Sequence, residues 1–234
     1  MKTRMLGVLG GMGPLASAEF MLRLTLLTPA ARDQDHVPAV LWSDPRVPDR
    51  IAGHLGTGES PLPVLLQGLA GLQAAGCGAV VMPCNTAHGW HGAMQAASSV
   101  PILHIVDAAE AELARLGVIP GPIGLMGTAG TLAMRLYQDR LEPHGWHCLT
   151  PTPDEMEELV LPAIARVKTG DVAGAYAPLA EVAHRLAARG TGAVVLACTE
   201  MPLGIRAGPA LTMPVCDTVD ALARAAIHWA LADP

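Results

Sequence analysis

The chain has 234 residues, of which 51% are hydrophobic and 15% charged, and its formal net charge is −6 at pH 7. A chain of this length and hydrophobicity buries a substantial core, which excludes a disordered protein. The acidic balance, without a long run of either charge, gives no electrostatic reason to expect binding to nucleic acid or to an anionic membrane.

No segment approaches the roughly 18 continuous apolar residues that a membrane span requires. The start of the chain is basic and then apolar, but the glycines at positions 10 and 11 interrupt the apolar run too early for a signal peptide. The five cysteines are odd in number and scattered, which is typical of a reducing compartment and not of a disulfide scaffold. We therefore expect a cytoplasmic protein.

Short apolar strands alternate with longer helical stretches along the whole chain. In the first half we expect strands at 6–9, 39–42 and 79–82 and helices at 15–27 and 61–76. In the second half we expect strands at 123–126, 147–150 and 193–196 and helices at 131–141, 154–168, 171–189 and 218–231. Pro162 is expected to kink its helix. Such alternation indicates an α/β fold with parallel sheets covered by helices.

Two segments are near copies of each other. Residues 76–86 (GCGAVVMPCNT) and 190–200 (GTGAVVLACTE) each read as a glycine turn, an apolar strand and a cysteine followed by a small polar residue. Residues 6–16 resemble 123–133, and residues 100–108 resemble 213–221, in the same order and at nearly the same offset. We therefore predict two pseudo-symmetric lobes of similar size. The first comprises residues 1–103 and 214–234, and the second comprises residues 104–213.

Functional loops of open parallel sheets lie at the carboxyl ends of the strands. The polar and glycine-rich segments at 10–14, 43–50, 84–86, 128–131 and 198–200 all fall at such ends. We therefore expect the active site in a cleft between the lobes.

Cys84 and Cys198 stand apart from the other three cysteines. Cys77, Cys148 and Cys216 lie in or beside apolar stretches and have no duplicate, so we interpret them as small buried residues. Backbone N–H groups at a strand-to-helix turn lower the pKa of a thiol, so one thiolate and one thiol could coexist near neutral pH at the duplicated pair. That state suits a reaction that removes a proton from one face of a carbon and returns it to the other.

Five motifs in this order carry a family resemblance over nearly the whole chain. They are GGMGP at 10–14, PDR at 48–50, MPCNTAH at 82–88, GTAGT at 127–131 and CTEMP at 198–202. Together they resemble the aspartate/glutamate racemase family, and within it the aspartate racemase branch. The resemblance implies an isomerase that interconverts the L and D forms of an acidic amino acid without pyridoxal phosphate or another cofactor. It also implies flavodoxin-like lobes and, commonly, a homodimer.

The resemblance assigns Cys84 and Cys198 as the two catalytic bases, one for each face of the α-carbon. A branch of the family has threonine in place of the first cysteine and prefers one enantiomer, and since this chain keeps both cysteines we expect action on both enantiomers. The implied neutral contacts to substrate are Met12, Asn85, Thr86, Thr128 and Thr199.

Three charged residues complete the implied site. Arg50 and Lys168 match the family's cationic positions for the side-chain carboxylate of the substrate, and Glu200 would contact the ammonium group or influence Cys198. Arginine offers a bidentate clamp to a carboxylate, which supports Arg50 independently. Taken alone, Lys168 reads as a favourable charge at a helix C-terminus.

Several alternatives stay open at the level of sequence. Cys84 with His88 and His91, or His144 with His147 and Cys148, are weak metal-site patterns without a fourth ligand, so we expect no metal. The glycine loop at 7–13 lacks the order of a dinucleotide fingerprint. A glutamate or hydantoin racemase-like enzyme, or a non-catalytic amino-acid-binding protein, remains an alternative to an aspartate racemase. A decarboxylase on this scaffold needs only one cysteine, so the pair of cysteines disfavours that reaction.

Overall fold

The computed structural model describes residues 4–232, so the first three residues of the basic start lie outside it. Its internal contacts divide the chain into two compact units. One comprises Met1–Ala108 with Val219–Pro234, and the other comprises Ala109–Thr218. The chain therefore passes between units near residues 108 and 218, in helix α5 (Ile105–Arg115) and at the start of α12 (Thr218–Leu231), where the sequence suggested 103 and 213.

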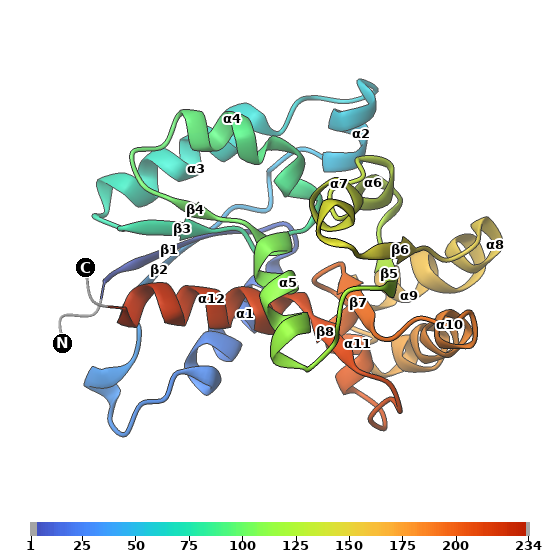
Figure 1. The fold of residues 1–234 in the computed structure, drawn as a ribbon. Coiled ribbons are helices and arrows are strands. Elements are labelled where there is room, and N and C mark those ends of the chain that lie inside the picture. Colours follow the sequence, from blue (N-terminus) through green and yellow to red (C-terminus); the bar gives the residue numbers. More distant parts are fainter. Residues whose placement is uncertain (1–3, 233–234) are drawn as a thin grey trace. The chain divides into compact units, whose positions relative to one another are not determined.

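The first unit is built on a parallel sheet with the strand order β2-β1-β3-β4 (Figure 1). Its strands are β1 (Leu6–Gly10), β2 (Ala39–Ser43), β3 (Ala79–Val81) and β4 (Ile102–Leu103). Its helices include α1 (Pro14–Leu27), α2 (Arg50–Leu55), α3 (Leu62–Ala74) and α4 (His91–Ala96), with short 3-10 helices at η1 (Asp33–Asp35) and η2 (Thr86–Trp90). Helices α3 and α4 cover one face of this sheet, and α1 and α12 cover the other.

The second unit repeats the arrangement with the strand order β6-β5-β7-β8. Its strands are β5 (Pro122–Gly127), β6 (His147–Leu149), β7 (Val194–Ala197) and β8 (Val215–Asp217). Its helical segments are α6 (Ala129–Ala133), α7 (Gln138–Leu141), η3 (Glu142–His144), α8 (Pro153–Glu155), η4 (Met156–Val160), α9 (Leu161–Lys168), η5 (Ala173–Ala175), α10 (Tyr176–Ala188) and α11 (Met201–Arg206). The two sheets have equivalent strand orders, which confirms the predicted two-lobe α/β fold.

Three helices of the second half differ from expectation. The predicted helix at 131–141 is broken, because Arg135 adopts a left-handed backbone (φ 51°) between α6 and α7. The predicted helix at 154–168 contains a π-helical segment, η4, which ends two residues before Pro162, and the helical run continues through the proline in α9. The regular helix predicted from 171 begins only at Tyr176.

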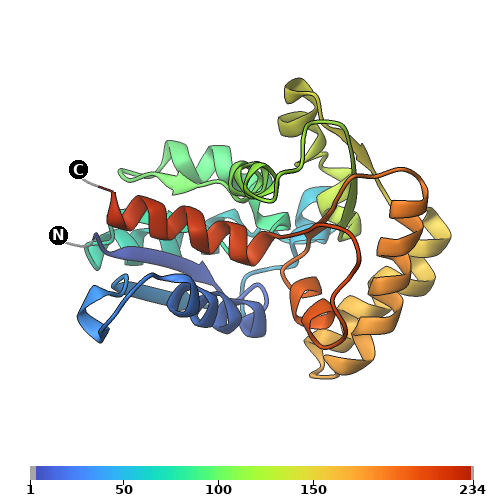
Figure 2. The same ribbon diagram turned by 60° about the horizontal axis from the view of Figure 1, so that its bottom comes forward.

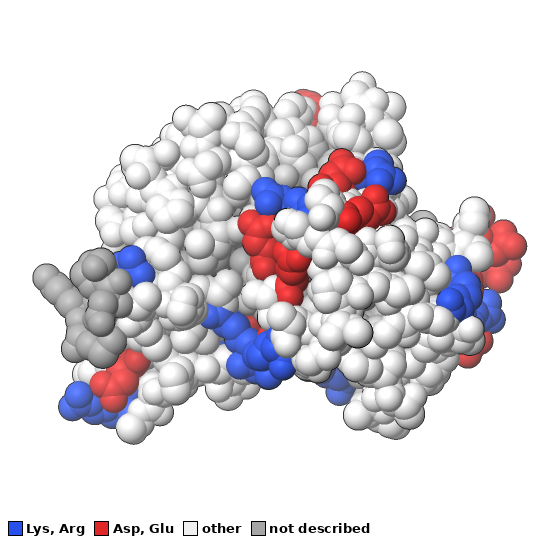
Figure 3. Space-filling model, viewed as in Figure 1, with Lys and Arg blue, Asp and Glu red and all other residues white. Residues whose placement is uncertain are grey.

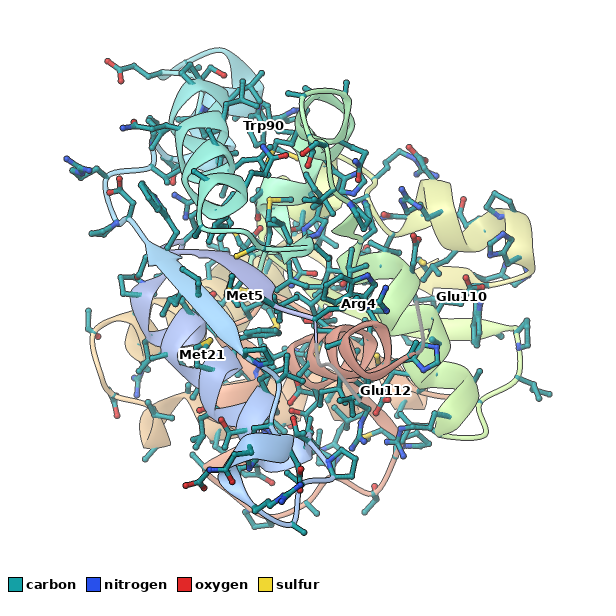
Figure 4. The ribbon with its side chains drawn as sticks, turned by 90° about the vertical axis from the view of Figure 1, so that its left-hand side faces the viewer. Arg4, Met5, Met21, Trp90, Glu110 and Glu112 are labelled. Atoms are coloured by element: carbon teal, nitrogen blue, oxygen red, sulfur yellow. The ribbon has the colours of Figure 1, made fainter. Side chains whose placement is uncertain are left out.

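The N-terminal strand is attached to the C-terminal helix within the first unit (Figure 2). The N–H of Arg4 donates to the carbonyl of Ala230 at 3.3 Å, and the guanidinium group of Arg4, labelled in Figure 4, lies 4.4 Å from the centre of the Trp229 ring. Helix α12 therefore completes the first unit although it follows the second in sequence.

Each unit has its own core of small aliphatic side chains. In the first unit the core gathers around Leu65, Leu69 and Val80, and in the second around Leu179, Val194 and Leu196. Charged side chains on the face shown in Figure 3 form small groups within a largely uncharged surface. Across residues 4–232, no helix combines the length and the hydrophobicity needed to span a bilayer.

Candidate active site

In both units, a glycine-containing loop and a cysteine lie side by side at the carboxyl end of the sheet. Strand β1 pairs with β3 with Val8 opposite Val81, so the register continues to Gly11 beside Cys84. Strand β5 pairs with β7 with Gly127 opposite Ala197, so Thr128 follows beside Cys198. Each cysteine therefore occupies the equivalent place in its own unit.

The loop after β1 is held closed by its own residues. Gly11 has φ +96°, and a Cβ atom there would lie 2.3 Å from the carbonyl oxygen of Asp44, so only glycine fits. The Ser17 hydroxyl accepts a hydrogen bond from the Gly11 N–H at 2.9 Å and donates to the Gly13 carbonyl at 2.8 Å. Met12, within this loop, is buried in the same hydrophobic cluster as Cys84.

The loop after β2 supports this arrangement through an ion pair. The Arg46 guanidinium binds both carboxylate oxygens of Asp44, at 2.9 and 2.8 Å. These hydrogen bonds, with a further one from the Arg46 N–H, lower the pKa of Asp44 to about 2. The carboxylate therefore stays ionised at neutral pH and keeps the Asp44 backbone against Gly11.

Cys84 lies in a tight, buried turn. Its side chain is 5% exposed, and Asn85 and Thr86, which follow it, are also buried. The Cys84 N–H donates to the Met82 carbonyl at 2.8 Å, and the His88 N–H donates to the Asn85 carbonyl at 3.0 Å in the first turn of η2. The predicted base and two of the predicted substrate contacts thus share one strand end.

Arg50 is the first residue of α2, which packs against η2 and hence beside the Cys84 turn. Its Nη1 donates to the carbonyls of Val47 and Pro48 at 3.3 and 3.2 Å, and its buried Nε has no hydrogen-bond partner among the described residues. Asp49 does not orient Arg50, because its carboxylate caps α2 by accepting from the Ala52 N–H at 2.8 Å. Backbone carbonyls therefore fix one end of the guanidinium and leave donor capacity at Nε.

Cys198 contacts an acidic side chain. Its thiol, 3% exposed, donates to Glu200 Oε2 at 3.1 Å, while the buried Oε1 of Glu200 has no partner among the described residues. Burial raises the pKa of Cys198 well above its ordinary value, and the negative charge of Glu200 adds to this effect. The sequence-based expectation of a lowered pKa is therefore wrong for Cys198, which is a protonated thiol at neutral pH.

The other predicted residues of the second unit surround Cys198 at the same end of the sheet or act on it by charge. Thr128 caps α6, since its hydroxyl accepts from the Thr131 N–H at 3.2 Å. Thr199 is buried beside Cys198. Lys168, exposed at the end of α9, forms no hydrogen bond or ion pair with the described residues, but its positive charge acts to lower the pKa of Cys198.

The remaining cysteines are isolated from this chemistry. Burial raises the pKa of Cys77, raises that of Cys148 to about 12, and raises that of Cys216 well above its ordinary value. Within residues 4–232, no three histidine, cysteine or acidic side chains are grouped so that they could hold a metal ion.

The structure thus gathers the predicted residues in two sets, one in each unit. Met12, Arg50, Cys84, Asn85 and Thr86 belong to the first, and Thr128, Lys168, Cys198, Thr199 and Glu200 belong to the second. Sequence reasoning missed the supporting roles of Ser17, Asp44 and the ring of His88. For His88 the sequence did offer a signal, namely its spacing of four residues from Cys84, which is about one helical turn.

The model of the Asp/Glu/Hydantoin racemase family matches residues 9–226. The chain belongs to this family. It is accordingly an enzyme of the racemase type, an isomerase, and its two-lobe fold is that of its relatives.

Individual relatives agree with this assignment. The structure of the Picrophilus torridus aspartate racemase superposes with a TM-score of 0.84 at 32% sequence identity, covering 97% of this chain and 94% of that chain. The broad specificity amino-acid racemase RacX of Bacillus subtilis is 27% identical over 206 residues, which are 84% of this chain and 86% of RacX. A glutamate racemase from Francisella tularensis has the same fold, with a TM-score of 0.70 at 15% identity over 96% of this chain and 80% of that one.

Proposed function

We propose that this enzyme interconverts the L and D forms of an acidic amino acid without a cofactor, with aspartate as the favoured substrate and glutamate as the second candidate. One observation carries the proposal: Cys84 and Cys198 occupy equivalent strand ends of two duplicated units, each beside the loop that follows the first strand of its sheet. The similarity to the Picrophilus torridus aspartate racemase favours aspartate.

The proposed chemistry is a proton transfer between two thiols through the α-carbon. One cysteine, as thiolate, removes the α-proton from one face, and the other, as thiol, donates a proton to the opposite face. The raised pKa of Cys198 makes it the proton donor of the resting enzyme. In the reverse direction Glu200 Oε2, 3.1 Å from the sulfur, accepts the proton of Cys198.

Two cations are proposed to bind the side-chain carboxylate of the substrate. The Nε donor of Arg50 has no partner among the described residues, and the fixed Nη1 keeps the guanidinium group in one orientation. Lys168, exposed at the end of α9, adds a second positive charge. Neutralising this carboxylate lets a substrate with two negative charges bind a largely buried site.

Charge that grows on the α-carboxylate during proton removal needs preorganised donors. The strand-end residues Asn85, Thr86 and Thr199, all buried, and the hydroxyl of Thr128 are the proposed donors on the two units. Donors fixed before the reaction stabilise this charge without the reorganisation that water requires.

The direct experiment is a chiral chromatography screen of acidic and small polar amino acids, one enantiomer at a time, with no added cofactor. The proposal predicts that D- and L-aspartate each reach an equal mixture, faster than asparagine or alanine. If every amino acid keeps its configuration while the enzyme is folded, the proposal is wrong.

One relative favours a second substrate range. RacX is described as a broad specificity amino-acid racemase, and this chain spans most of its length. If the present enzyme behaves in the same way, neutral amino acids racemise at rates comparable to that of aspartate in the same screen.

A non-catalytic binding protein would bind an amino acid without exchanging its α-hydrogen with heavy water. The proposal also includes a homodimeric state and a cytoplasmic location. Sedimentation velocity measures the oligomeric state.

A further inference from the structure

Three histidine rings pack together in the first unit, next to the Cys84 turn. His88 and His104 have ring centres 4.7 Å apart, His91 and His104 4.6 Å, and His88 and His91 6.0 Å. His88 and His104 are buried. The proposed proton transfer uses none of the three, so their role needs a separate explanation.

Both ring nitrogens of His88 have defined partners. Nδ1 lies 2.9 Å from the carbonyl oxygen of Cys84, and Nε2 lies 3.2 Å from the backbone nitrogen of Ile105. A carbonyl only accepts and a backbone N–H only donates, so Nδ1 carries the proton and Nε2 accepts. These partners fix one neutral tautomer, and the ring, 3% exposed, is shielded from water.

The other two rings attach the same cluster to the edge of the sheet. His91 Nε2 donates to the Ile102 carbonyl of β4 at 2.8 Å, and His104 Nδ1 accepts from the Val106 N–H in the first turn of α5 at 3.2 Å. Since His88 also contacts Ile105, the ring of His88 connects the Cys84 turn to the start of α5.

We infer that His88 is a positioning residue for Cys84: its Nδ1–H holds the Cys84 carbonyl and thereby sets the direction of the Cys84 thiol. The inference rests on the proposed function, in which Cys84 is one of the two bases. The duplicate turn differs, because Pro202 occupies the position four residues after Cys198 and has no ring nitrogen to donate. There the Cys198 carbonyl accepts a backbone bond from the Met201 N–H at 3.0 Å.

A positioning role has a specific kinetic consequence. Proton transfer is sensitive to the placement of the reacting atom, so a displaced Cys84 slows the chemical step, while the proposed carboxylate contact at Arg50, outside this turn, is unchanged. Loss of the hydrogen bond to the carbonyl therefore lowers kcat by a larger factor than it raises KM.

Two substitutions separate the two hydrogen bonds of His88. In His88→Asn the amide nitrogen takes the place of Nδ1 and can still donate to the Cys84 carbonyl, but the acceptor for Ile105 is lost. In His88→Gln the terminal oxygen takes the place of Nε2 and can still accept from Ile105, but the donor to Cys84 is lost. Each variant loses one neutral hydrogen bond, so the two are expected to lose similar stability.

We expect His88→Asn to keep kcat within about threefold of the wild-type value and His88→Gln to lose about tenfold, with a smaller change of KM in both. In His88→Gln the primary isotope effect of α-deuterated substrate is expected to rise for only one enantiomer, the one whose α-hydrogen Cys84 removes. Equal losses of kcat in the two variants, or equal isotope effects from both enantiomers, would overturn the inference.

A second measurement does not depend on activity. Two-bond proton–nitrogen NMR spectra of the labelled wild-type enzyme, assigned with His88→Asn, report which ring nitrogen carries the proton. The inference predicts the Nδ1–H tautomer at neutral pH, and an Nε2–H tautomer or a protonated ring contradicts it. If the wild-type enzyme racemises no amino acid, the proposed function fails, and the tautomer decides whether the hydrogen bond to Cys84 exists.

Discussion

The two units share a strand order but surround their cysteines differently. In the first, Cys84 lies beside a loop that Gly11 and Ser17 hold closed, and the ring of His88 binds its backbone carbonyl. In the second, Cys198 has a carboxylate partner, Glu200, which contacts the sulfur itself. The Cys84 turn thus has a histidine on its backbone carbonyl, and Cys198 has a carboxylate on its sulfur.

This difference teaches that the duplicated sheet fixes where a thiol lies, while its surroundings are specific to each unit: at Cys198 burial, and then the charge of Glu200, raise the pKa of the thiol. Thr128, the counterpart of Gly11, has an ordinary backbone (φ −68°) and caps a helix, whereas Gly11 has φ +96° and packs on Asp44. A pair of equivalent positions can therefore perform unequal tasks, as a proton transfer between two groups requires.

Removing either thiol tests whether both units are needed. Cys84→Ala and Cys198→Ala should each lower the racemisation rate by about 10²–10⁴-fold, the usual contribution of a positioned acid or base. Serine at either position should be nearly as damaging, because a hydroxyl is a far weaker acid. Rates are measured by circular dichroism with each enantiomer of aspartate.

Cys148→Ala is the matched control, because burial raises the pKa of Cys148 to about 12 and the proposed proton transfer does not involve it. It should keep wild-type activity. A Cys84→Ala enzyme that racemises at the wild-type rate would remove the first unit from the chemistry.

Gly11→Ala should be the most destabilising of the small changes to the first unit. The left-handed backbone costs a residue with a Cβ about 1–2 kcal/mol. The contact with the Asp44 carbonyl adds a further cost of about 1–3 kcal/mol. Gly56→Ala is the control, since Gly56 also has positive φ (+69°) but no atom within 4 Å of the added Cβ. Urea unfolding should show a larger loss in the free energy of unfolding for Gly11→Ala than for Gly56→Ala. Equal losses would show that the loop moves to accommodate the added Cβ.

Arg50→Lys should raise KM for aspartate about tenfold and leave KM for asparagine unchanged, because the amide carries no charge to clamp. The fixed guanidinium is expected to match a carboxylate in a way that a lysine ammonium does not. Arg32→Lys serves as control, since Arg32 forms an exposed ion pair with Asp35 that contributes little. Similar changes of KM for the acid and the amide would argue against a carboxylate clamp at Arg50.

Glu200→Gln should have the smallest effect on rate, about a tenfold loss from a weakened acid–base partner. It should also lower the pKa of Cys198, because the carboxylate charge disfavours the thiolate and its removal leaves that form more stable. The pH profile of Cys198 alkylation by iodoacetamide should therefore move to lower pH. Exposed Glu157→Gln should move neither quantity, and a shift toward higher pH in Glu200→Gln would reverse the assigned sign.

The strands that carry the cysteines were predictable because glycine turns bracket short apolar runs, and β3 and β7 lie within one residue of the expected ranges. The break at Arg135 and the π-helical segment of η4 were not, because the apolar spacing there also fits one continuous helix. Tertiary contacts decide such cases.

The placement of the candidate residues at strand ends followed from the sequence, but their electrostatics did not. The pKa of Cys198 depends on how deeply the folded unit buries the thiol and on which rotamer brings Glu200 to it. The bond from His88 to Cys84 depends on the geometry of η2, and the neutral tautomer depends on Ile105, which is distant in sequence. The roles of the site residues stay predictions.

The most direct measurement is the fate of the α-hydrogen during the first turnovers in heavy water, starting separately from L- and D-aspartate. With two bases the product enantiomer carries deuterium at its α-carbon, while the remaining substrate keeps its original hydrogen, in both directions. Deuterium appearing in substrate and product at the same rate, or product that retains the substrate hydrogen, would contradict an exchange between Cys84 and Cys198.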